Sequence, residues 1–135
     1  MKKIILFAGL IFAFIQTKAQ QSINKEPAGF DTVYNIVDTL PSFIGGEEAW
    51  KKYLKKNMKY PKKAWWEELE ADVYLEFVVR KDGSITDIAH LTVNGWGFEE
   101  EAVRLLKNSP KWKPGIKNKV SVNYHAKLSI PFRLK

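Results

Sequence analysis

The chain has 135 residues, of which 45% are hydrophobic and 27% are charged, and its formal net charge is +7. This length is typical of a single domain, and the hydrophobic fraction is large enough for a packed core, so widespread disorder is excluded. The absence of cysteine excludes disulfides, thiolate metal sites and cysteine nucleophiles.

Residues 1–19 have the pattern of a secretory signal peptide. Lys2 and Lys3 precede an uninterrupted apolar run over residues 4–15, and Ala19 follows shortly after it. A membrane-spanning helix needs about 20 apolar residues, so the run favours a cleaved leader over a permanent anchor. We therefore expect cleavage after Ala19 and export to the periplasm. The alternative is an uncleaved leader that anchors the chain in the inner membrane, facing the periplasm.

Residues 20–36 are predicted to form an N-terminal leader segment, because the chain is polar and unpatterned as far as residue 32. Residues 33–37 are compatible with a short strand. Without the signal peptide the chain is modestly basic, which favours an acidic partner but is too weak to indicate nucleic-acid binding.

Two helices are predicted next along the chain. Residues 47–58 form a helix in this prediction, because their apolar side chains recur with a helical period on one stripe. Glutamates in its first turn and lysines toward its end suit the helix dipole. Residues 62–69 are predicted to form one more short helix.

A β-hairpin is predicted to follow the helices. Residues 72–80 alternate between apolar and polar side chains, which indicates a half-buried strand. Asp82 and Gly83 supply the positive φ that a tight turn requires. Residues 85–93 return as the second strand, with a phase slip near Asp87 that indicates a bulge.

The last part of the chain is predicted to hold a helix over residues 98–108 and then a long strand. Residues 120–134 alternate without a break, and as a strand they would span about 50 Å, beyond the usual length. Two shorter partners cannot match such a strand fully, so part of its backbone edge is expected to be free. Pro131 has no N–H for a ladder, which also indicates a sheet edge or a strand end.

No catalytic or metal-binding pattern is found in the sequence. His90 and His125 are the only histidines, whereas a zinc site needs three or four ligands, so both are interpreted as solvent-facing strand residues. Glu99, Glu100 and Glu101 are interpreted as a dipole-compensating first helical turn rather than as acid catalysts. We predict a non-enzymatic protein with no metal, no cofactor and no small-molecule substrate.

Two tryptophans are candidates for contact with a partner, and a third, Trp112, has two possible roles. Trp65 and Trp66 are adjacent, so a helix cannot turn both inward, and both are kept as partner-contact candidates. Trp112 lies between two lysines, which fits either base stacking or packing of the ring while the lysines stay in water. We favour packing for Trp112.

The order of motifs resembles the C-terminal domain of TonB, and in particular the Bacteroidetes-type energy transducers. The matching stretches are residues 41–49, 53–54, 57–61, 78–87, 100–102, 110–115 and 130–134. The resemblance covers residues 37–135. It implies a small α+β domain with a three-stranded antiparallel sheet and two helices packed on one face.

The resemblance also implies a way of binding. Family members sit in the periplasm and engage outer-membrane receptors, whose short TonB box adds as a strand to the exposed edge of the domain. Matched onto this chain, the contact surface falls on the final strand. Its residues are Val120, Ser121, Val122, Asn123, Tyr124, His125, Ala126, Lys127 and Leu128.

We therefore expect a non-catalytic periplasmic module that pairs by strand addition with the TonB box of an outer-membrane receptor, or with another envelope protein. Family transducers carry a membrane anchor and a long proline-rich spacer, and this sequence shows neither, so we expect binding rather than force transmission. One alternative is an energy transducer anchored by an uncleaved leader. Another is a structural or self-associating envelope protein that dimerises through the same edge. Export argues against a nucleic-acid partner.

Overall fold

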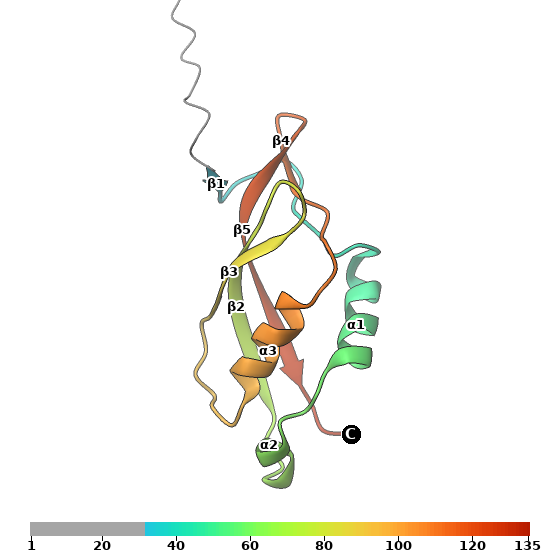
Figure 1. Cartoon of the computed structure of the whole chain (residues 1–135), viewed down its shortest axis with the longest axis vertical. Helices are drawn as coiled ribbons and strands as arrows, with labels where there is room; N and C mark the ends of the chain where they lie inside the picture. The colour runs from blue at the N-terminus through green and yellow to red at the C-terminus, as the bar shows by residue number, and fades with distance from the viewer. Residues whose placement is uncertain (1–31) are drawn as a thin grey trace, which may run out of the picture. The chain divides into compact units, whose positions relative to one another are not determined.

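The computed structural model describes residues 32–135 (Figure 1). The predicted signal peptide and most of the predicted leader segment lie outside the described residues. In chain order the elements are β1 (Val33–Tyr34), α1 (Gly46–Asn57), α2 (Lys62–Trp66), β2 (Ala71–Val79), β3 (Ile85–His90), α3 (Phe98–Lys107), β4 (Gly115–Lys117) and β5 (Val120–Phe132). Within this range no helix combines the length and the apolar character that crossing a bilayer requires.

The strands form one mixed sheet in the order β1-β5-β2-β3, and β4 also pairs with β5. The pairs β2–β3, β2–β5 and β4–β5 are antiparallel, whereas β1 runs parallel to β5. The prediction of a small α+β domain is confirmed, but its detail is corrected. The sheet has five strands and is mixed, and the described residues hold three helices. The two extra strands have only two and three residues, too few for a recognisable alternation.

The hydrophobic core lies between one face of the sheet and the helices. β2 turns Val73, Leu75, Phe77 and Val79 to this face, and all four are fully buried. β5 adds alternate residues that end at Phe132, and the cluster also contains residues of α1, α2 and α3. The alternation predicted for β2 therefore places its apolar side under the helices, as a half-buried strand requires.

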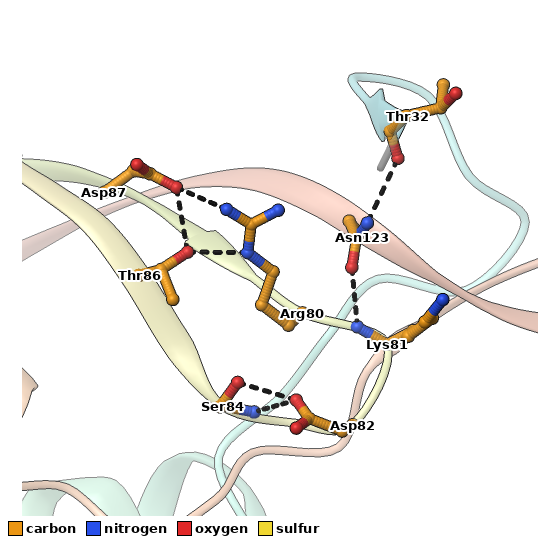
Figure 2. Close-up of polar contacts among 8 residues, drawn as sticks. All are labelled: Thr32, Arg80, Lys81, Asp82, Ser84, Thr86, Asp87 and Asn123. Atoms are coloured by element: carbon orange, nitrogen blue, oxygen red, sulfur yellow. Dashed lines mark hydrogen bonds and ion pairs between the residues drawn. The ribbon is translucent and has the colours of Figure 1, made fainter. Parts of the chain in front are cut away.

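The β2–β3 hairpin contains the predicted bulge. The register between the two strands shifts between Glu76 and Val78 of β2, and Asp87 of β3 has a φ of +53°. Arg80 Nη2 lies 2.7 Å from Asp87 Oδ2, and Arg80 Nε donates to Thr86 Oγ1 at 2.7 Å (Figure 2). The irregular residue Asp87 is therefore held by the residue that directly follows β2.

Candidate functional site at the edge of β5

β5 has partner strands along its length, but not at both edges. β2 pairs with residues 124–132 of β5, and β4 pairs with residues 120–122. Tyr124 also pairs with Tyr34 of β1, so β1 lies at the edge opposite β2. β1 ends there, and no other strand of the described chain pairs with β5 at that edge. Residues 125–131 at the edge opposite β2 are called the free edge below.

Backbone groups of alternate residues point out from the free edge. The C=O of Tyr74 accepts a hydrogen bond from the N–H of Leu91 at 2.7 Å, so the backbone of Tyr74 points toward β3 and away from β5. Ser129 lies opposite Tyr74 in the ladder, so its N–H and C=O also point away from the shared ladder, to the free edge. The same holds at every second residue, including Pro131. The missing N–H of Pro131 therefore leaves the β2 ladder intact, which agrees with its predicted place at a sheet edge.

β1 covers the same side of β5 just before the free edge, and a buried side chain holds β1 there. Asn123 is only 4% exposed. Its Nδ2 donates to the C=O of Thr32 at 3.3 Å, and its Oδ1 accepts a hydrogen bond from the N–H of Lys81 at 2.9 Å (Figure 2). The Asn123 amide therefore links Thr32, just before β1, to Lys81, just after β2.

The nine predicted contact residues fall in three different environments. Val120, Ser121 and Val122 pair with β4. Asn123 and Tyr124 lie opposite β1. His125, Ala126, Lys127 and Leu128 lie on the free edge, which continues beyond them as far as Pro131. The structure thus places four of the nine on the free edge.

The free edge has a polar face and an apolar face. Lys127 and Ser129 are exposed on one face, whereas Ala126 is buried and Leu128 packs against the core on the other. A hollow of about 160 Å³ lies beside Ala126 and Leu128, and Leu40 forms part of its wall. A strand added here would place alternate side chains toward this hollow and the rest toward solvent.

The three tryptophans that the sequence singled out have different surroundings. Trp65 and Trp66 on α2 are both exposed, at 53% and 75%, and their ring centroids are 4.9 Å apart. The helix therefore turns neither ring fully inward. Trp112 packs against Phe43 and Trp50, with centroids 5.7 and 5.6 Å away, which confirms packing as its role.

The histidines do not assemble a site with other ligands. His90 is exposed, as predicted, and the His125 side chain is about one third exposed, with Nε2 3.5 Å from Glu76 Oε2. Among residues 32–135 no group of three His, Asp or Glu side chains is placed to hold a metal ion.

Two acidic residues of α3 have a role that the sequence did not indicate. Glu99 and Glu101 are buried, although they were interpreted only as dipole-compensating residues. Burial acts to raise the pKa of Glu99, but hydrogen bonds from the backbone N–H groups of Asn94 and Gly95, at 2.6 and 3.0 Å, outweigh it and lower that pKa. These carboxylates hold neighbouring backbone in place, and no local pattern distinguishes them from the exposed Glu100.

These observations define a small α+β domain whose longest strand has an open edge. A family model described as Gram-negative bacterial TonB protein C-terminal matches residues 56–134. The chain therefore belongs to the TonB C-terminal domain family, as the order of its motifs predicted. None of the curated proteins matches the chain. The family is non-enzymatic and envelope-associated, engages outer-membrane receptors, and takes part in TonB-dependent transport.

Proposed function

We propose that this domain binds the TonB box of an outer-membrane receptor, in the periplasm, by adding it as a strand to the free edge of β5. The observation that carries the proposal is the row of outward backbone groups at Lys127, Ser129 and Pro131, which no strand of the described chain pairs, on a strand that β2 holds through nine residue pairs. Backbone hydrogen bonds would supply most of the affinity, and the hollow beside Ala126 and Leu128 would select a side chain of the partner.

Self-pairing through the same edge is less well supported. Lys127 is exposed on the edge and Pro131 lacks an N–H, and both features are ways in which edge strands avoid pairing with each other. A receptor segment with a different sequence does not repeat these obstacles. The observations therefore favour a partner strand over a second copy of the chain.

Amide shifts of the isotopically labelled protein test the proposal. Synthetic TonB-box peptides from the receptors encoded in the same genome would be titrated into it. We expect the largest shifts at Lys127 and Ser129, whose N–H groups point to the free edge. Shifts confined to β3, or no shift with any of these peptides, would contradict the proposal. Line broadening that grows with protein concentration and without peptide would indicate dimerisation instead.

A matched pair of variants tests whether backbone pairing carries the affinity. Ser129→Pro removes an outward N–H and places a ring on the edge, whereas Ser129→Ala keeps the N–H. We expect Ser129→Pro to weaken binding by about tenfold, and Ser129→Ala to change it little. The amide spectrum of β2 in each free variant checks that the fold is retained. Equal affinities for the two variants would exclude strand addition at this position.

The proposed signal peptide has its own test. Mass spectrometry of the purified protein from its native cells gives the mature N-terminus. We expect the mature chain to begin at Gln20. A mature chain that retains residues 1–19 would favour the anchored transducer.

A further inference from the structure

A larger hollow lies at the far end of the free edge, between α1, α2 and the residues that follow β5. Its volume is about 500 Å³. Pro131 is one of the residues that line it, so the hollow and the free edge meet. Its apolar wall is formed by Leu54, Met58, Tyr60, Trp65 and Leu134.

The rim of this hollow is basic, and no acidic residue lines it. Four cationic side chains reach it: Lys51, Lys55, Arg133 and Lys135. Lys51 and Arg133 are already ion-paired within the chain. Lys55 and Lys135 make no ion pair in the part of the chain that the structure describes. Two cations are therefore available to carboxylates of a partner.

Trp65 gives the hollow a feature that is common at binding surfaces. Trp65 is 53% exposed, although it forms part of the apolar wall. Exposed tryptophans next to a cavity frequently anchor an interface, because covering them removes much apolar surface from water. The adjacent Trp66 is more exposed, yet it does not line this hollow.

We propose that this hollow, the basic pocket, binds a large apolar side chain flanked by carboxylates on the partner segment, just beyond the stretch that pairs with β5. The proposal rests on the proposed function, because a segment paired along the free edge reaches the pocket at Pro131 without a break. The apolar wall selects the side chain, and the unpaired lysines select the acidic neighbours. A membrane surface fits less well, because it would contact the exposed Lys52 and Lys56 on the same helix as readily as Lys55.

Designed peptides test the pocket and the free edge separately. The probe is a capped peptide with a seven-residue alternating Thr/Val core and the tripeptide Asp-Phe-Asp at both ends. Its control has the same core with Lys-Phe-Lys ends. The Trp65 indole N–H and the Met58 methyl group report on the pocket, and the amides of Lys127 and Ser129 report on the edge.

We expect the acidic peptide to shift both sets of signals and the basic peptide to leave the pocket signals unmoved, at peptide concentrations up to about 1 mM. Edge shifts without pocket shifts would overturn the pocket and support strand addition. Pocket shifts without edge shifts would support the pocket and count against strand addition by this peptide. No shift in either set, or pocket shifts of the same size with the basic peptide, would overturn the pocket proposal.

Neighbouring residues provide matched variants for the two halves of the pocket. Lys55→Glu should weaken the acidic peptide about fivefold, whereas Lys56→Glu makes the same change in the same helical turn but outside the pocket. Trp65→Ala should weaken binding about tenfold and Trp66→Ala much less. Equal effects within either pair would overturn the assignment. A membrane surface would be indicated by a different result. In that case the protein would bind phosphatidylglycerol vesicles but not the acidic peptide, and both lysine variants would weaken vesicle binding equally. This result would also overturn the assignment.

Discussion

Glu101 Oε1 lies 2.6 Å from the backbone nitrogen of Lys59, and this hydrogen bond joins α3 to the chain that leaves α1. The same carboxylate forms a two-point ion pair with Arg104, at 2.7 Å for each contact. Arg104 in turn donates to the C=O of Asn57 at 2.8 Å. The chain on both sides of Met58, which lines the basic pocket just after α1, is therefore held from α3.

Replacing Glu101 tests this connection. Glu101→Ala removes the acceptor of the Lys59 N–H and the carboxylate partner of Arg104, so we expect the free energy of unfolding to fall by about 3 kcal/mol. Urea denaturation measures the change. The exposed neighbour provides the control, since Glu100→Ala should stay within about 0.5 kcal/mol of the wild type. A similar loss of unfolding free energy in the two variants would show that the contacts of Glu101 with Lys59 and Arg104 do not stabilise the fold.

Glu99 is expected to make stability depend on acid pH. Backbone hydrogen bonds hold its folded pKa below the ordinary value of 4.5. A carboxylate with a lowered folded pKa stabilises the fold above its unfolded pKa, and this contribution is lost as the pH falls through the folded pKa. Glu99→Gln should therefore lower stability at neutral pH and flatten the fall of stability below pH 4.5. Thermal unfolding at a series of pH values from 7 to 2.5 measures this dependence, with Glu100→Gln as the matched variant. If the stability of Glu99→Gln falls with acid as steeply as that of the wild type, the role assigned to Glu99 is contradicted.

Gly83 is expected to tolerate no side chain. Its φ is +84°, and a Cβ atom there would lie 2.1 Å from the carbonyl oxygen of Trp112, a backbone atom that cannot swing away. Gly83→Ala should destabilise the fold by about 3 kcal/mol or more. Gly46 has a φ of +79° but open space around the missing Cβ, so Gly46→Ala should cost only about 1 kcal/mol. Chemical denaturation of both variants separates the backbone strain from the steric clash.

Tyr34 is expected to control how far the free edge extends. It lies opposite Tyr124 in a strand of two residues, and Tyr34→Pro should release β1 because proline has no N–H for the ladder. Hydrogen exchange at Asn123 should then speed up by about tenfold, and the footprint of a bound peptide should grow toward that residue. Tyr34→Ala keeps the N–H and serves as the control. Unchanged exchange in the proline variant would show that β1 does not cover the edge.

Local patterns in the sequence were sufficient to predict the main elements and one property of the site. The alternation from residue 120 onward predicted β5, and Pro131 indicated an edge, because a proline is tolerated only where its missing N–H faces no ladder. Asp82 and Gly83 predicted the turn between β2 and β3, where Gly83 takes a positive φ. These features depend on residues close together in the chain, so a single sequence contains them.

The boundaries of the site depended on tertiary contacts. β1 covers Asn123 and Tyr124 from a segment about 90 residues away in the chain, and its two residues are too short to form a pattern. The basic pocket joins side chains from α1, α2 and the residues after β5, and the burial of Glu101 depends on where α1 ends. Residues close together in the sequence determine hydrophobic periodicity and turn formation. Which part of a strand edge stays open, and which cations stay unpaired, depends instead on which distant segments of the chain pack nearby.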